Sequence, residues 1–310
     1  MTARDENVGA DRAEGQRAFA RWWSGHPACT GLRDRLAGVD VPGAARLIAA
    51  ALPLIEDIAW IEELVARAAR GAAADPWFEP PLRALDHTRQ LGLVLFDDRR
   101  LRISVHALPL EAVAAHKAAV LGPRSVVFTG TQTLTRIVRS AGAEIDLWHA
   151  DPAGSDFAAA RAGRCRPAGR LVLHDGQMLA IDGAQEAWTI ARQRGDVLIV
   201  QATARDVDAP LAVEYDAATG GFLAASAIDG SVARLQLMAT LLRLMDRRDA
   251  AGALAEAAKE SPFFLRWHLA RELVALDAAA AAPLLRRLAT EDDHPEVRRA
   301  ASRTLALIAA

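Results

Sequence analysis

The sequence predicts a multi-domain α+β protein with N-terminal helices, a central antiparallel β barrel or sandwich and C-terminal helical repeats. Three observations lead to this prediction: a helical apolar period between Ala18 and Gly71, short strand-like runs between Leu91 and Asp229, and a repeated helical pattern after Ser231. The length of 310 residues agrees with several domains, because a domain usually contains about 100 to 200 residues.

Composition and charge restrict the classes of function. Hydrophobic residues make up 52% and charged residues 25% of the chain, which is typical of a folded globular protein. A formal net charge of −2 gives no general attraction for nucleic acid, so we expect no nucleic-acid partner. Cys29 and Cys165 have no CxxC spacing and predict reduced thiols. Without a signal-like N-terminus or a long apolar run, we expect a cytoplasmic protein with no membrane span.

Residues 14–90 are predicted to form a helical region followed by a connector. The polar stretch 1–13 before them predicts a disordered tail. Apolar residues recur at steps of three and four from Leu47 to Val65, as on one face of a helix. Pro53 within this pattern should kink the helix or split it in two, because proline has no N–H to donate. Three prolines between Asp75 and Gln90 exclude a continuous helix there.

Residues 91–230 are predicted to form the β region. Eleven short runs rich in Val, Ile, Leu and Thr alternate with turns such as Asp175-Gly176 and Asp182-Gly183. Their spacing of about ten residues favours a sandwich or a barrel. Two interruptions are expected, an inserted helix at 109–122 and a long loop at 151–169.

Residues 231–310 are predicted to form helical repeats with a period of about 32 residues. Leu265-Arg266 in one copy corresponds to Val297-Arg298 in the next, and Pro262 or Pro295 opens the helix in each copy. An earlier helical segment precedes each of these helices, so the unit is an antiparallel helix pair. Such a pair cannot bury its apolar face alone and must stack on a neighbour.

The last of these helices resembles the HEAT repeat family in its short bacterial form. An acid, a proline, a Val-Arg pair and an alanine stand in the expected places at Asp292, Pro295, Val297, Arg298 and Ala301. The resemblance covers residues 232–310 and implies that Asp292 and Arg298 form a structural ladder between repeats, that the short array packs on the β domain, and that the protein recognises a protein or peptide partner. Arg299 and Arg303, four apart on the outer face, are the candidate binding residues.

The β region resembles the cupin family, a double-stranded β-helix barrel. The segment GRLVLHDGQMLAIDGAQEAWTIARQRGDVLIV is similar to the second half of that fold, in which a Gly-Asp turn precedes a strand. Cupins often hold a divalent metal on an HxH pair, a Glu and a later His, and no HxH pair occurs in this chain. A cluster could still assemble from His106, His116, His149 and Glu144. Glu144 and His149 are five apart, which places them on opposite faces of a regular strand.

Two classes of function follow from these patterns. The first is a non-catalytic protein- or peptide-binding scaffold that combines a degenerate cupin-like domain with HEAT-like repeats and needs no cofactor. The repeat favours it, as does the lack of a phosphate loop, a GxGxxG, a GxSxG or an HExxH motif. The alternative is a metal-dependent cupin-type enzyme, an oxygenase or isomerase with one divalent metal such as Fe, Mn or Zn and a small-molecule or peptide substrate.

Overall fold

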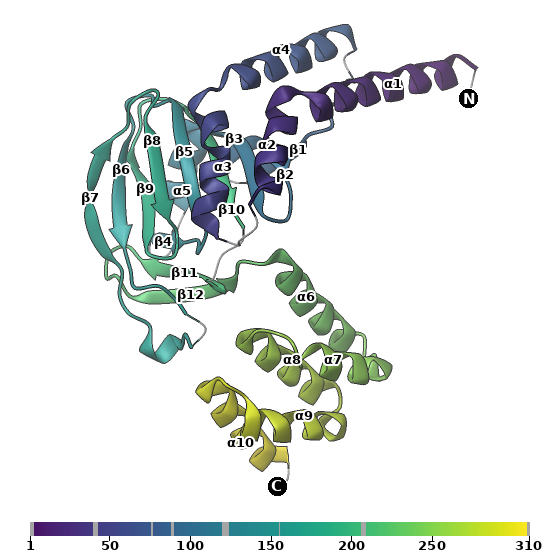
Figure 1. Cartoon of the computed structure of the whole chain (residues 1–310). Helices are drawn as coiled ribbons and strands as arrows, with labels where there is room; N and C mark the ends of the chain where they lie inside the picture. Colours follow the sequence, from purple (N-terminus) through teal and green to yellow (C-terminus); the bar gives the residue numbers. More distant parts are fainter. Residues whose placement is uncertain are drawn as a thin grey trace.

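The computed structural model describes residues 3–39, 43–75, 77–87, 90–119, 124–154, 156–205 and 209–308. Helices lie at both ends of the chain, and antiparallel β-sheets lie between them (Figure 1). This arrangement confirms the α+β class and the order of the three predicted parts. No described helix combines the length and the apolar character that crossing a lipid bilayer requires.

Four helices precede the sheets: α1 (Ala3–Gly25), α2 (Pro27–Ala37), α3 (Ala44–Glu56) and α4 (Ala59–Ala74). The break between α3 and α4 confirms the expected split near Pro53, which lies inside α3 one turn before its end. The Asp57 carboxylate accepts a hydrogen bond from the Ala59 N–H (3.0 Å) and helps to begin α4.

Aromatic side chains anchor the first helix. The Trp23 ring stacks on Trp60 of α4, with ring centroids 5.6 Å apart. Its indole N–H donates a hydrogen bond to the Leu95 carbonyl in the second strand (3.0 Å). Helix α1 begins at Ala3, so residues 3–13 of the expected tail form the first turns of this helix, and residues 1 and 2 lie outside the described chain.

The β region consists of twelve described strands: β1 (Arg83–His87), β2 (Gln90–Asp97), β3 (Leu101–Leu108), β4 (Ser125–Phe128), β5 (Gln132–Arg139), β6 (Glu144–His149), β7 (Arg166–Val172), β8 (Met178–Asp182), β9 (Glu186–Arg192), β10 (Val197–Ala204), β11 (Leu211–Asp216) and β12 (Phe222–Ala227). Each of the eleven predicted runs forms a strand, and β1 is an additional strand within the predicted connector. The inserted helix is confirmed as α5 (Leu110–Ala119).

The strands form three antiparallel sheets. Sheet A has the order β1-β2-β3-β10-β5-β8, sheet B the order β12-β11-β4, and sheet C the order β7-β6-β9. Strands β1, β2 and β3 are consecutive, but β10 lies far along the chain from both of its neighbours: Val200 of β10 pairs with Val105 of β3 and with Arg136 of β5. Sheets of this kind depend on long-range pairing, which local patterns in the sequence do not specify.

The two faces of sheet A bury different partners. On one face, Ile103, Leu134 and Val200 pack against the N-terminal helices, and α3 lies across β5 and β10. On the other face, Ile137 and Ile199 pack with Ile145 of sheet C. This alternation is what a strand with two buried faces requires, and it fixes sheets A and C as facing layers.

Five helices complete the described chain: α6 (Gly230–Leu244), α7 (Ala251–Ala257), α8 (Phe263–Leu276), α9 (Ala278–Glu291) and α10 (Pro295–Ile308). They correspond to the five predicted segments, with Pro262 at the N-cap of α8 and Pro295 as the first residue of α10. Helix α8 contacts α6, α7, α9 and α10. The C-terminal region is therefore helical and has its own apolar core; its membership of the HEAT family remains a prediction from the sequence.

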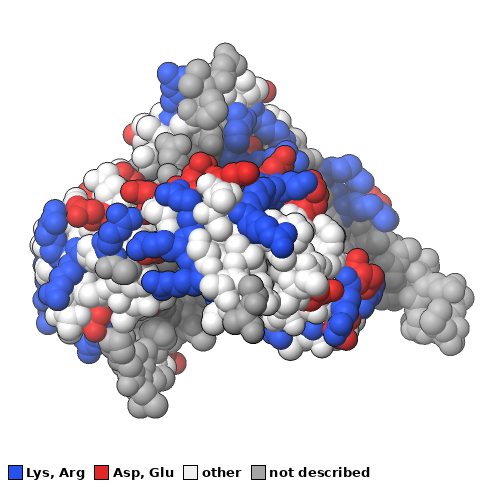
Figure 2. All heavy atoms as spheres, turned by 90° about the horizontal axis from the view of Figure 1, so that it is seen from below, with Lys and Arg blue, Asp and Glu red and all other residues white. Residues whose placement is uncertain are grey.

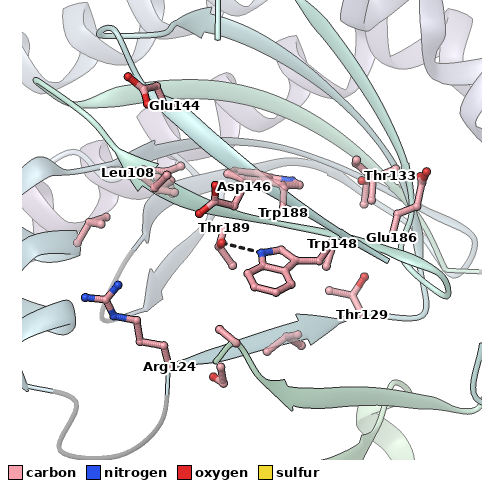
Figure 3. A pocket seen from close by; sticks show the side chains of 18 of the residues that line it. Leu108, Arg124, Thr129, Thr133, Glu144, Asp146, Trp148, Glu186, Trp188 and Thr189 are labelled. Atoms are coloured by element: carbon pink, nitrogen blue, oxygen red, sulfur yellow. Dashed lines mark hydrogen bonds between the residues drawn. The ribbon is translucent and has the colours of Figure 1, made fainter. Parts of the chain in front are cut away.

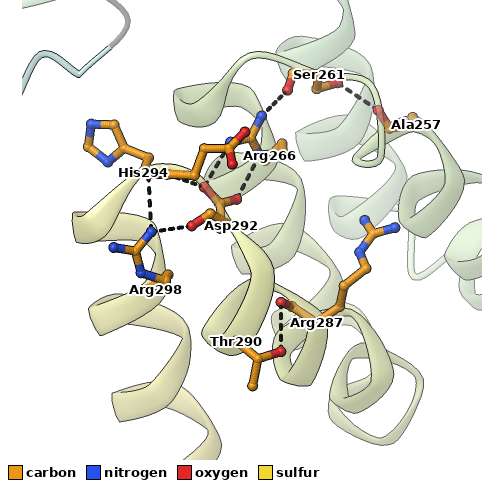
Figure 4. A network of polar contacts seen from close by, with 9 residues as sticks. Ala257, Ser261, Arg266, Arg287, Thr290, Asp292, His294 and Arg298 are labelled. Carbon is orange, nitrogen blue, oxygen red and sulfur yellow. Dashed lines mark hydrogen bonds and ion pairs between the residues drawn. The ribbon is translucent and has the colours of Figure 1, made fainter.

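A polar network joins α8 to the loop before α10 (Figure 4). Both oxygens of the buried Asp292 carboxylate accept hydrogen bonds from Arg266, at 2.7 and 2.8 Å. Arg298 instead donates to the main-chain carbonyls of Asp292 and Asp293. The expected contact between Asp292 and Arg298 thus exists through the backbone, and the link between the two copies is made by Arg266, the arginine of the earlier copy.

The helical region packs on the β region through aromatic rings. The His294 ring stacks on Phe263 with centroids 4.1 Å apart, and its Nε2 lies 3.1 Å from the Phe157 carbonyl oxygen. Phe157 in turn packs on Phe222 of β12, with centroids 5.6 Å apart. These contacts agree with the expectation that the helices pack on the β domain.

We predict that Asp292→Asn lowers the free energy of unfolding by about 2 to 3 kcal/mol at pH 7, because it removes the partner of a mostly buried Arg266. Burial alone would raise the pKa of Asp292, but hydrogen bonds from Arg266 and the His294 N–H, with the Arg266 charge, hold it below the ordinary value. The contribution of the Asp292–Arg266 ion pair to the free energy of unfolding is therefore present at neutral pH and is lost as pH falls below about 4.

Urea unfolding at several pH values measures this difference. The difference in the free energy of unfolding between wild type and Asp292→Asn should become smaller from pH 7 to pH 3. Asp293→Asn changes an exposed neighbouring carboxylate and should have a free energy of unfolding close to that of wild type at every pH. A gap that does not change with pH would contradict the assigned ion pair.

Candidate functional site

A cavity of about 960 Å³ lies where the three sheets meet. Sheet A contributes one wall, β4 of sheet B a second, and β6 and β9 of sheet C a third. The residues that line it are Leu108, Val113, Arg124, Ser125, Val127, Thr129, Thr131, Thr133, Glu144, Asp146, Trp148, Arg170, Ile181, Glu186, Ala187, Trp188, Thr189, Ile190, Ala191, Arg192, Gln201, Thr203, Ala217 and Ala218. Its volume is that of a site for a small molecule or a short peptide.

The cavity runs along two strand edges. All residues of β9, from Glu186 to Arg192, line it. Because successive residues of a strand point to opposite faces, a complete run can line a cavity only where the cavity passes the edge of the strand. Within the described ranges, β9 pairs only with β6, and β4 pairs only with β11.

The strands β4 and β9 lie next to each other without forming a ladder in the described chain. They are tied together at one end, where the Gly130 N–H donates to the Gly183 carbonyl (2.9 Å). Beyond this contact, β4 and residues 186–190 of β9 carry on their facing edges the alternate N–H and C=O groups that an antiparallel strand directs away from its ladder partner. The cavity is therefore a cleft between two strand edges.

Two tryptophans give the cleft an aromatic surface. The indole N–H of Trp148 donates to the Thr189 hydroxyl across sheet C (3.1 Å), which fixes the ring beside the cavity (Figure 3). Trp148 and Ala187 face each other in the β6–β9 register, and Leu147 faces Trp188. The two indoles thus come from opposite faces of sheet C, on either side of the β9 edge.

Sheet A supplies a polar wall. Thr133, Gln201 and Thr203 line the cavity, and the Gln201 amide donates to the Thr135 hydroxyl (2.9 Å). The Gln201 carbonyl and the hydroxyls of Thr133 and Thr203 can accept or donate hydrogen bonds toward a bound molecule.

Most charged groups of the cleft neutralise one another. Arg192 lies 3.0 Å from Glu144, and Arg170 lies 2.7 Å from Asp146. The hydrogen bond and the charge of Asp146 raise the pKa of Arg170 above its ordinary value. Arg124, directly before β4, lines the cavity and has no side-chain partner within the described chain; Figure 3 shows its side chain at one end of the cavity.

The candidate metal ligands occupy different parts of the β region. His106 lies on β3, buried, with Nε2 2.7 Å from the Ser104 hydroxyl. Glu144 lines the cleft and is held by Arg192 and, at 3.9 Å, by Arg170. His149 ends β6, five residues from Glu144, and does not line the cleft.

His116 belongs to α5, and its side chain lies outside the described part of the structure. The described residues contain no group of three or more His, Cys, Asp or Glu that could hold a metal ion. The side chains that do meet in the cleft, Arg124, Trp148 and Thr189, were not singled out from the sequence. Their meeting depends on the order of strands β4, β6 and β9, which no local motif encodes.

The candidate binding residues Arg299 and Arg303 lie on α10, and both are exposed. Arg299 is within 3.9 Å of Glu296 one turn earlier, a weak surface pair. On the face of the molecule seen from below, basic and acidic side chains lie next to one another around a pale area without charged residues (Figure 2). This mixed face fits the net charge of −2.

Comparisons with known proteins give distant likenesses only. No protein family matches the chain, and no curated protein matches it. Among solved structures, a cupin domain from Bordetella pertussis Tohama I is 10% identical with a TM-score of 0.23, over 39% of this chain and 97% of its own. The Cnp3 cupin domain of Schizosaccharomyces pombe is 8% identical with a TM-score of 0.25, over 40% and 69%. Ectoine synthase from P. lautus is 13% identical with a TM-score of 0.23, over 39% and 68%.

At TM-scores this low, the likenesses support no conclusion about this chain. The cupin-like character of its β region remains a prediction from the sequence.

Proposed function

We propose that the protein is a non-catalytic peptide-binding protein whose β region receives an extended peptide segment in the cleft between β4 and β9. The observation that carries this proposal is the pair of facing strand edges along the cavity. An unpaired edge is a template for another strand, and adding a peptide strand to a sheet edge is a recurring mode of peptide recognition.

The walls of the cleft suit such a segment. Main-chain hydrogen bonds to the β9 edge, from Glu186 to Ile190, would supply affinity that is independent of sequence. Side chains of a bound strand would alternate between the two faces of sheet C. One set would meet Trp148 and Thr189, and the other Trp188 and the threonines of sheet A.

Charged side chains of the cleft favour one orientation of a bound peptide. In Figure 3, Arg124 and Glu186 lie on opposite sides of the cavity. The carboxylates of Glu144 and Asp146 are already paired with arginines, so the Arg124 guanidinium is the cation available to a ligand. An acidic side chain or a terminal carboxylate at that end of the peptide would form a charge-assisted hydrogen bond with it.

The helical regions serve as the scaffold in this proposal. The HEAT-like resemblance of residues 232–310 supports a role in recognition of proteins or peptides, and the exposed Arg299 and Arg303 remain the proposed contacts of that region. Neither contributes to the cleft, so the two surfaces can be tested separately.

We predict that a fluorescein-labelled seven-residue peptide of alternating Val and Thr binds more tightly with a terminal Glu than with a terminal Lys. Arg124→Ala should weaken binding of the Glu peptide about tenfold, the effect of losing about 1.4 kcal/mol. Arg303→Ala is the matched control and should leave binding unchanged. Fluorescence polarisation measures all three proteins, and equal affinity of Arg124→Ala and wild type for both peptides would contradict the role of Arg124.

Backbone N-methylation of the same peptide tests strand addition separately. Methyl groups on the residues whose N–H groups face β9 should abolish binding, while methylation of the intervening residues should be tolerated where the peptide pairs with β9 alone. Binding that survives both methylation patterns would exclude a strand-like ligand.

The metal-dependent alternative makes a different prediction. For the binding protein we expect no stoichiometric Fe, Mn or Zn in material purified without chelator, measured by elemental analysis before and after reconstitution. One metal ion per chain that disappears in His149→Ala or His106→Ala would instead support a cupin-type enzyme and overturn the non-catalytic assignment.

A further inference from the structure

Helix α6 and its C-cap residue expose a row of large apolar side chains, here named the α6 stripe: Leu237, Met238, Leu241, Leu244 and Met245. Each is more than half exposed, with Leu237 at 72% and Leu244 at 69%. Their spacing of three and four residues places them on one side of the helix. A contiguous row of exposed Leu and Met on a folded protein marks a surface that another chain covers.

The stripe is exposed because of the position of α6 in the helical region. The opposite side of α6 packs on α8, where Ala239 is fully buried and the Thr240 hydroxyl donates to Glu272 (3.0 Å). Helix α8 has helices on several sides, whereas α6 follows directly after β12 and starts the helical region (Figure 1). Within the described ranges, no helix packs against the α6 stripe.

We propose that a second copy of this chain covers the stripe, with the two α6 helices antiparallel around a twofold axis at Leu241. The stripe residues lie at offsets of −4, −3, 0, +3 and +4 from Leu241. Antiparallel pairing therefore places Leu237 opposite Met245 of the other copy, and Met238 opposite Leu244. A face that matches itself under a twofold rotation is what an isologous dimer requires.

Charged residues flank the α6 stripe at both ends. Arg234, one turn before Leu237, forms no ion pair within the described chain, whereas Asp246 and Asp249 follow the C-terminal end of α6 and pair locally with Arg248 and Arg247. In the antiparallel arrangement, Arg234 of each copy lies opposite Arg248 of the other copy, near the Asp246 carboxylate with which that Arg248 pairs. In a parallel arrangement, the two Arg234 side chains would face each other.

The size of the stripe predicts a modest affinity. A specific interface buries at least about 1,200 Å² in total. Ten Leu and Met side chains, five from each copy, reach at most about this lower limit, and only if all of their exposed surface is covered. We therefore expect a dimer that dissociates on dilution.

Site-specific cross-linking tests the twofold pairing in the full chain. Leu241→Cys should form a disulfide-linked dimer under mild oxidation, because residue 241 meets itself across the axis. Leu237→Cys alone should not, because it faces Met245, but Leu237→Cys combined with Met245→Cys should. The native Cys29 and Cys165 are both buried, so wild type is the unlinked control. Equal linking of Leu237→Cys and Leu241→Cys would overturn the antiparallel dimer in favour of a parallel one.

Light scattering over a range of concentrations tests the dimer itself. Wild type should approach twice the chain mass as concentration rises, and Leu241→Arg should remain at one chain mass with an unchanged melting curve. Leu307→Arg, at a 79% exposed apolar residue on α10, is the matched control and should still dimerise. A wild-type protein that stays at one chain mass at every concentration would overturn the proposal and leave the stripe to a different partner.

Discussion

The proposed function depends on two facing strand edges, those of β4 and of residues 186–190 of β9, which join no ladder on this side within the described chain. A strand edge that carries free N–H and C=O groups is unstable unless water, another strand or a covering segment satisfies it. Here, the short contact between Gly130 and Gly183 ties the two strands at one end, and the remaining edges border a cavity of about 960 Å³. The cavity exists because sheets B and C approach each other without joining.

The rest of the molecule keeps those edges in place. The apolar layer around Ile137, Ile145 and Ile199 holds sheet C against sheet A, and the N-terminal helices cover the outer face of sheet A. On the other side, the helical region contacts β12 and the loop at Phe157 through Phe263 and His294. Since packed interiors resist deformation, these contacts give a preformed cleft, in which a ligand need not order the strands on binding.

The sequence was most informative where structure is local. The period around Leu47 to Val65, the turns between strands and the Val-Arg repeat near Arg298 predicted the helices and strands correctly. The cleft could not be predicted, because Arg124, Trp148 and Thr189 meet only through the pairing of distant strands. The cupin resemblance directed attention to histidines, whereas Glu144, its carboxylate candidate, is engaged by two arginines. Ion pairs of this kind follow from strand register, which a single sequence does not show.

Amide hydrogen exchange of residues 186–190, with and without the Glu-terminated Val-Thr peptide, tests the central claim most directly. If a peptide strand adds to the β9 edge, amides that point away from β6 should become protected, and those already bonded to β6 should change little. Protection should thus alternate along the strand. Saturating peptide that leaves the exchange of these amides unchanged would contradict strand addition and the function proposed for the cleft.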